Sequence, residues 1–179
     1  ARVRQIYGHS GAIFVETTYL WGAPLLSNFA EHCNRTLPAP DGDCRLIGQP
    51  GVPIDSSCDI ENPYIKHFFS GSLEVCVMAL RQYEHTKNGL RDGRVLLELS
   101  DDVLMFYREH WRWATVNGIM HLFNSSGCES WPRCDDPAPE IAGLTVLLEG
   151  LLALPADVAD QSVLGHQAWR QMLKSLPPL

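Results

Sequence analysis

The sequence predicts a mainly α-helical fold, a single-domain helical bundle over residues 1–179 with long disulfide-stapled loops. Three observations lead to this fold class. Apolar side chains recur at helical spacing in several stretches, Pro/Gly/Asp-rich segments separate these stretches, and most of the six cysteines lie in those segments. A length of 179 residues fits one domain, and a hydrophobic content of 45% supplies enough apolar side chains for a core.

Charge and hydropathy narrow the classes of partner. The chain has 14 Lys and Arg against 21 Asp and Glu, which gives a formal net charge of −7. A nucleic-acid-binding protein presents a basic field to the phosphate backbone, so we expect no nucleic-acid partner. A membrane span requires roughly 20 consecutive apolar residues. No run in the chain approaches that length, so we expect no membrane span.

The run near the N-terminus is open to two interpretations. Residues 12–21 are rich in β-branched and aromatic side chains, which fit a strand, and their number also allows a short helix. A strand here favours the alternative fold class, an α+β ectodomain with an N-terminal strand at 12–21. Gly22-Ala23-Pro24 then breaks the run.

A long loop and a first clear helix follow. Residues 34–63 are rich in Pro, Gly and Asp, and loops of this length inside a domain are commonly functional or cross-linked. We therefore expect a cross-linked loop at about 34–63. Residues 64–88 predict a helix that ends at Asn88-Gly89. Its apolar stripe consists of Leu73, Cys76, Val77, Leu80 and Tyr83.

The strongest helical pattern lies in residues 94–123. Ser100 is the predicted N-cap, because Asp101 and Asp102 follow it and suit the positive end of the helix dipole. We expect a helix of about 23 residues from there. Residues 95–99 fit either a separate strand or an added helical turn. The face that repeats in steps of four and three comprises Val103, Phe106, His110, Trp113, Asn117 and Met120.

Two more helices are predicted towards the C-terminus. A second cross-linked loop at 125–139 precedes an apolar helix over 140–154, which Pro155 ends. Gly143 and Gly150 weaken that helix, so we expect a neighbouring helix to approach it closely there. A last helix, at about 157–175, carries a face made of Trp169, Met172, Leu173 and Leu176.

The cysteines indicate a disulfide framework whose pairing the sequence leaves open. Most of them lie in loop segments, where a bridge compensates for missing core packing. Cys128 and Cys134 bracket a small loop that a bridge would close, and Cys33 and Cys44 bracket another. The disulfide candidates are Cys33, Cys44, Cys58, Cys76, Cys128 and Cys134.

Two N-x-[ST] sequons lie beside cysteines, since Asn34 follows Cys33 and Asn124 precedes Cys128. Both asparagines are candidate glycosylation sites, because both fall in expected loops. Sequons together with a disulfide framework predict an extracellular or secretory location. In the alternative, a cytosolic protein with reduced thiols, Cys76 packs as a small buried hydrophobe.

The sequence holds no catalytic or metal-binding motif, so we predict a protein that is not an enzyme and needs no cofactor or metal. His110 and His121 are eleven residues apart on the expected long helix, which is not the i, i+3 or i+4 spacing of two metal ligands. We expect His110 to have a structural role, with Asn117 as its hydrogen-bond partner. An active site built on His110 or His121 is the enzymatic alternative.

Aromatic residues form a second flank on the expected long helix. Tyr107 and Trp111 lie apart from the stripe that contains Phe106 and Trp113. This pattern predicts either a central helix buried all round, which we favour, or an exposed patch. For an exposed patch, the candidate partner-binding residues are Tyr107, Arg108 and Trp111, because Tyr, Trp and Arg dominate interface energetics.

The order of the elements resembles that of helical cytokines. It comprises a first helix, a long cross-linked loop, two central helices, a stapled loop and C-terminal helices. The resemblance implies a secreted or ectodomain protein-binding module that acts by receptor or partner recognition without catalysis. Pro155 departs from the single long final helix of such proteins.

A second resemblance supports an alternative function. A long helix with Trp113 and a later helix with Trp169 are similar in layout to the B-cell-lymphoma family of apoptosis regulators. That layout implies an intracellular protein that binds a partner helix in a groove. The family's Asn-Trp-Gly-Arg signature is absent, because residues 111–114 read Trp-Arg-Trp-Ala.

Overall fold

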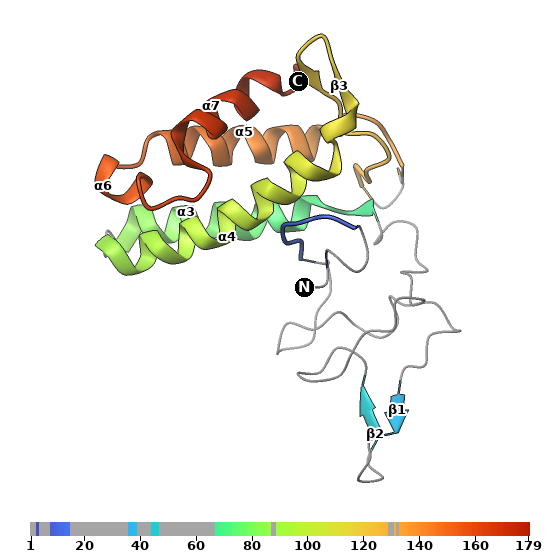
Figure 1. Ribbon diagram of the computed structural model, residues 1–179, viewed down its shortest axis with the longest axis horizontal. Coiled ribbons are helices and arrows are strands. Elements are labelled where there is room, and N and C mark those ends of the chain that lie inside the picture. Colours follow the sequence, from blue (N-terminus) through green and yellow to red (C-terminus); the bar gives the residue numbers. More distant parts are fainter. Residues whose placement is uncertain are drawn as a thin grey trace.

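The computed structural model describes residue 3 and residues 8–14, 36–38, 44–46, 67–86, 89–128, 131 and 133–179. Over these residues the chain is mainly helical, as predicted (Figure 1). The helices are α3 (Ser70–Thr86), α4 (Gly89–His110), the 3-10 turn η2 (Arg112–Ala114), α5 (Ala138–Leu152), α6 (Ala156–Ala159) and α7 (Gly165–Ser175). The strands form two short antiparallel hairpins, β1 (Thr36–Pro38) with β2 (Cys44–Leu46) and β3 (Thr115–Val116) with β4 (Ile119–Met120).

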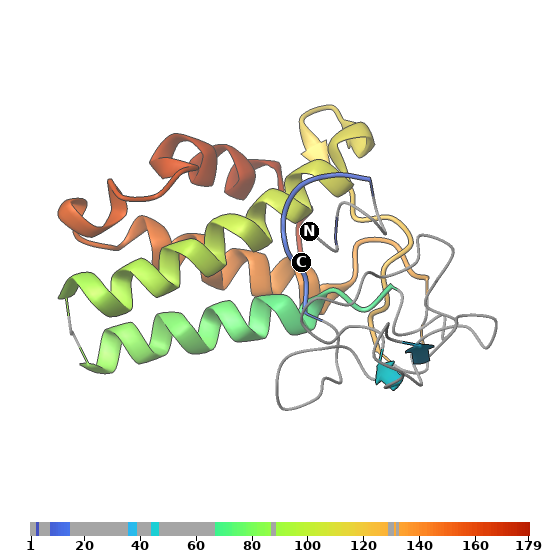
Figure 2. The same cartoon turned by 60° about the horizontal axis from the view of Figure 1, so that its bottom comes forward.

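The helices pack around a shared interior. α3 and α4 form a helical hairpin, α5 packs against α3, and α7 packs against α5 and the β4 strand (Figures 1 and 2). α6 contacts α4. Within the described ranges, each helix is too short or too polar to span a bilayer.

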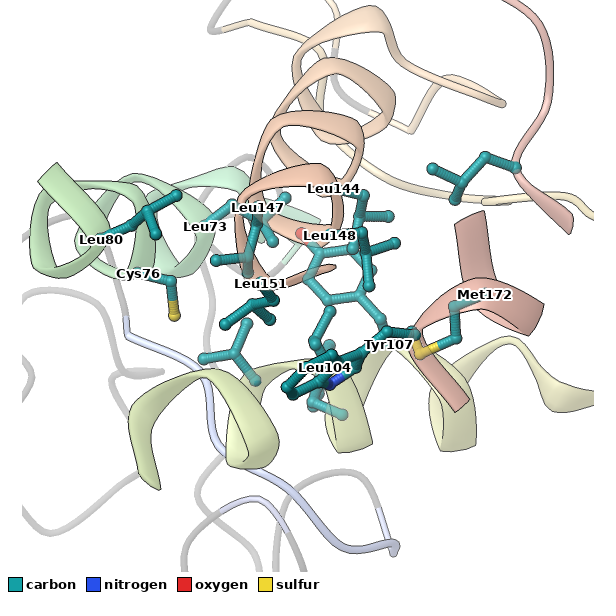
Figure 3. Packing of buried hydrophobic residues seen from close by; sticks show 14 of the residues in the cluster. Leu73, Cys76, Leu80, Leu104, Tyr107, Leu144, Leu147, Leu148, Leu151 and Met172 are labelled. Carbon is teal, nitrogen blue, oxygen red and sulfur yellow. The ribbon is translucent and has the colours of Figure 1, made fainter. Parts of the chain in front are cut away.

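The core is formed mainly by apolar side chains from four helices, to which α6 adds Val158 and Ala159. α3, α4, α5 and α7 each contribute residues that meet in the interior (Figure 3). Removal of this apolar surface from water is the main favourable term in folding. Cys76 belongs to the core and is fully buried, and burial raises the pKa of its thiol to about 12. It therefore packs as a small hydrophobe, as the alternative interpretation of this cysteine expects.

The two glycines of α5 lie where α3 approaches, which confirms the prediction made for them. A Cβ atom at Gly143 would lie 2.9 Å from Leu73 Cδ1 and 3.0 Å from Leu73 Cβ. A Cβ atom at Gly150 would overlap the Leu80 side chain. The absence of side chains at these positions allows α5 and α3 to pack closely.

The predicted start of the long helix is wrong. α4 begins at Gly89, directly after α3, and Ser100 is buried in the middle of the helix rather than at its N-cap. Asp101 serves a different element, because its Oδ1 accepts from Ser162 Oγ at 2.6 Å and its Oδ2 from the Val163 amide at 2.7 Å. Asp101 thus stabilises the turn between α6 and α7. This turn divides the single final helix that the sequence predicts.

The predicted end of the long helix is also wrong. α4 ends at His110, and Asn117-Gly118 forms the tight turn between β3 and β4, with φ angles of 51° and 84°. Asn-Gly is a strong signal for a two-residue hairpin turn, because both residues tolerate positive φ. Asn117 therefore does not partner His110. Its helical spacing in the sequence is coincidental.

The predicted disulfide staple at 125–139 is absent. Cys76, Cys128 and Cys134 carry free thiols. The antiparallel register places Cys134 opposite Ser125 and Cys128 opposite Trp131, so the two cysteines do not face each other. Backbone hydrogen bonds close this loop instead, and the Cys134 thiol donates to the Ser125 carbonyl oxygen at 3.3 Å.

Several predictions fall outside the described residues. The side chains of Cys33, Cys44 and Cys58 are among them, so their pairing stays a prediction. Residues 12–14 do not form a strand, and residues 15–21 lie outside the described ranges.

A buried carboxyl group joins the second loop to the helices. Glu140, in the first turn of α5, is fully buried, and its Oε1 accepts from Ser125 Oγ at 2.8 Å. Burial raises the pKa of this carboxyl to about 7, although Ser125 and the backbone amides of Glu140, Phe69 and Ser70 act to lower it. Glu140 therefore lies where α5, the start of α3 and the loop at 125–139 meet.

The α3–α5 contact predicts the effect of Gly143→Ala. Alanine favours helix by about 1 kcal/mol, but overpacking a core costs about 1–3 kcal/mol. Leu73 Cβ is fixed to the backbone and cannot rotate away, so we expect a net loss of about 1 kcal/mol in the free energy of unfolding. Urea denaturation measures the change. Glu149→Ala on the exposed side of α5 is the control, and a stabilised Gly143→Ala variant would contradict the close approach.

The buried Glu140 carboxyl predicts a dependence of stability on pH. Its pKa is higher in the folded chain than the ordinary 4.5, so its contribution is full below pH 4.5 and is lost as the pH rises towards 7. Glu140→Gln cannot ionise. We therefore expect the stability difference between variant and wild type to shift by about 2 kcal/mol in favour of the variant between pH 5 and pH 8.

Chemical denaturation at a series of pH values measures this difference, in which the titration of all other groups cancels. Glu74→Gln on the exposed face of α3 is the matched control and should show no such trend. A difference that stays constant with pH would show that Glu140 is ionised at no cost in the folded chain.

Candidate functional site

A basic groove lies at the end of α4. It is a surface cavity of about 370 Å³ between the last turn of α4, η2, the β3–β4 hairpin and α7. Its polar lining comprises Arg108, Arg112, Thr115, Gln171, Lys174 and Ser175, and its apolar lining includes Met120, Ala168 and Met172. We call this cavity the α4–α7 groove.

Local structure explains how the three cations converge. Arg108 is in the last turn of α4, and Arg112 follows in η2. α7 buries Trp169 and Met172 against the core, which leaves Gln171 and Lys174 exposed. Because α7 packs beside the β4 strand, its C-terminal turn reaches the end of α4 (Figure 1). Lys174 also suits the negative end of the α7 dipole.

The groove carries excess positive charge. Glu109 lies 3.6 Å from Arg108 and 3.7 Å from Arg112, so one carboxylate faces two guanidinium groups. Both distances exceed those of charge-assisted hydrogen bonds. Among the described residues, no carboxylate lies within ion-pair distance of Lys174. A positive groove on a chain with a formal net charge of −7 is a local departure from the overall charge.

Of the three candidate partner-binding residues, only Arg108 reaches the surface. Tyr107 and Trp111 are 0% and 1% exposed. Trp111 Nε1 donates to the Phe123 carbonyl oxygen at 2.9 Å, and the Tyr107 and Trp111 rings lie 5.3 Å apart. The aromatic flank thus belongs to a central helix, the interpretation that the sequence analysis favours, and a surface partner does not reach these two rings.

His110 belongs to a cluster of aromatic rings. It stacks on Phe106 with ring centroids 4.9 Å apart, and its Nδ1 lies 2.8 Å from Nε2 of His9. Burial, and to a smaller extent His9 and His67, lower the pKa of His110 to about 4. His110 is therefore neutral near pH 7.

His121 has a separate environment. Its Nδ1 lies 2.6 Å from Asp136 Oδ2, and Asp136 Oδ1 accepts from the Leu122 amide at 2.7 Å. This contact ties the segment after β4 to the end of the second loop. His110 and His121 do not share a helix, contrary to the prediction. Among the described residues, no group of three or more His, Cys, Asp and Glu side chains is arranged to hold a metal ion.

A second groove, of about 590 Å³, lies between α4 and the turn before α7. Three of its four charged groups are already engaged, because Arg94 pairs with Glu98 at 2.7 Å and Asp101 binds the Ser162 hydroxyl and the Val163 amide, while Asp102 is the fourth. This groove therefore offers less unpaired charge to a ligand than the α4–α7 groove.

The structure describes the sequon at Asn124 but not the sequon at Asn34. Asn124 is exposed, in the left-handed region at φ 59°, while Ser125 and Ser126 of the same sequon are buried. Asn34 lies outside the described residues. Glycosylation at either position stays a prediction.

Sequence reasoning missed two of the three cations in the groove. Arg112 stands four residues after Arg108, a spacing that places the two side chains near each other at a helix end. Lys174 carried no signal, because only the packing of α7 brings it there.

A scan of protein-family models, a search of curated proteins and a search of solved structures each find no match to this chain.

Proposed function

We propose that this chain is a non-catalytic protein-binding module, secreted or part of an ectodomain, that recognises an acidic segment of a partner protein in the α4–α7 groove. The observation that carries the proposal is the convergence of Arg108, Arg112 and Lys174, with Glu109 as the one nearby carboxylate in the part of the chain that the structure describes. Guanidinium groups bind carboxylates in a bidentate geometry, which gives direction as well as attraction.

Size and lining support the same occupant. A cavity of about 370 Å³ accommodates a few side chains of a peptide segment. Met120 and Met172 supply an apolar floor, and methionine adapts its shape to different partners. The cations lie at the rim, where charge chiefly increases the rate and the selectivity of association.

The alternative function is an apoptosis-regulator-like groove that holds a partner helix. Such a groove is apolar, because it receives the hydrophobic face of an amphipathic helix. The α4–α7 groove has three cations and several hydroxyl and amide groups in its lining. The acidic segment is therefore the better-matched occupant.

Reversal of charge in the groove tests the proposal. With a fluorescein-labelled hexaglutamate peptide as the probe, we expect Arg112→Glu/Lys174→Glu to weaken binding at least about 10-fold, because like charges then face each other. Fluorescence anisotropy at low and physiological salt measures the dissociation constant. Wild-type protein should not bind a hexalysine peptide.

Arg81→Glu/Arg94→Glu is the matched control. It changes the net charge by the same amount. Both arginines lie outside the α4–α7 groove, and they pair with Glu84 and Glu98. Equal weakening in both double variants would indicate a general effect of net charge and would refute the groove as the site. Absence of binding to the wild type would refute the acidic partner.

The secreted setting predicts a glycan. We expect the chain, expressed through a secretory pathway, to gain glycan mass at Asn34 or Asn124, and the structure predicts free thiols at Cys76, Cys128 and Cys134. Intact mass with and without deglycosylation, and peptide mapping after thiol alkylation in denaturant, measure both. Unmodified asparagines would remove the main support for the secretory location.

A further inference from the structure

We propose that residues 8–14 form an acid-sensitive strap on α4: protonation of His110, which is hydrogen-bonded to His9 of the strap, releases the strap and uncovers the aromatic ring of Phe106 beneath it. The strap is argued from contacts outside the α4–α7 groove and does not rest on the proposed function. At the strap, the chain covers α4, whereas the α4–α7 groove is open to a ligand.

Backbone contacts fasten the strap to both helices of the hairpin. The Ala12 amide donates to the Asp102 carbonyl oxygen of α4 at 2.9 Å, and the Phe14 amide donates to Ser72 Oγ of α3 at 2.7 Å. Gly11, at φ 109°, lies so close to α4 that a Cβ atom would overlap the backbone of Phe106. The segment crosses α4 in Figure 2, where it is drawn in blue.

One end of the strap depends on a pair of histidines. His9 Nε2 lies 2.8 Å from His110 Nδ1, so one ring donates a proton that the other accepts. The His9 ring also lies 5.1 Å from the ring of Phe106. Protonation of His110 places a positive charge on a ring that is packed against Phe106 and bonded to the strap, and the cost of burying this charge favours release of the strap.

The groups around His110 disfavour its charged form. His9 of the strap and His67, which precedes α3, both lower its pKa, after the larger effect of burial, to about 4. The neighbouring residue in α4, Glu109, directs its carboxylate towards Arg108 and Arg112. The rings of Phe69 and Trp111 lie 5.2 and 4.5 Å from the His110 ring.

The direction of the effect follows from linkage. The pKa of His110 is depressed in the closed chain relative to the ordinary 6.5, so its contribution to closure is complete above pH 6.5 and is lost as the pH falls towards 4. After an allowance for partial exposure, the equilibrium constant for opening should rise on the order of 10-fold between pH 7 and pH 5.

Amide hydrogen exchange measured by NMR tests this inference. The Ala12 and Phe14 amides, each corrected for its intrinsic exchange rate, should lose protection on the order of 10-fold between pH 7 and pH 5. The amides of Leu147 and Leu148 in α5 should keep theirs, because the core stays folded. Equal protection of the strap amides at both pH values would overturn the proposal.

Two variants separate titration from packing. His9→Gln/His110→Asn keeps amide groups at the places of the two bonded nitrogens but cannot titrate, so protection of the strap should become independent of pH. His85→Gln, an exposed histidine in the last turn of α3, is the control and should behave as wild type. An unchanged pH dependence in the double variant would assign the effect to other groups. If that variant does not fold, the wild-type measurement alone decides.

Discussion

The close contact between α5 and α3 is the constraint on which the remaining structure depends. It requires glycine at positions 143 and 150, because Leu73 and Leu80 occupy the space that side chains would need. Its consequence extends to the surface. With α5 fixed against α3, α7 packs on α5 and ends beside β4, so that Lys174 comes to lie near the arginines at the end of α4.

Two buried ionisable groups respond to pH in opposite directions. The carboxyl of Glu140 is more easily accommodated when protonated, whereas the imidazole of His110 is more easily accommodated when neutral. Between about pH 4.5 and 6.5 their effects on global stability therefore offset each other. Acid strengthens the contact of α5 with the start of α3 while it weakens the strap. A local opening is thereby separated from unfolding of the core.

Local pattern in the sequence identified the helices of the core but not their ends or their mutual contacts. The apolar periodicity of α5 and its two glycines sufficed for both its position and its packing. The extent of α4 was missed because Asn117-Gly118 continues a helical spacing by coincidence while it makes a hairpin turn. The groove and the histidine pair could not be predicted, since Lys174 and Arg108, like His9 and His110, are distant in the chain and meet only through tertiary packing.

The strap and the groove both contact the C-terminal part of α4, which couples them through charge. His110 stands between Arg108 and Arg112, at a helix C-terminus whose dipole favours a cation. Burial nevertheless keeps the ring neutral. Release of the strap in acid would let His110 take up a proton, and this adds a positive charge to the last turn of α4, which also carries Arg108 of the groove. If the groove binds an acidic segment as proposed, that segment would then bind more tightly to the open form. By reciprocity, its binding would favour the opening of the strap.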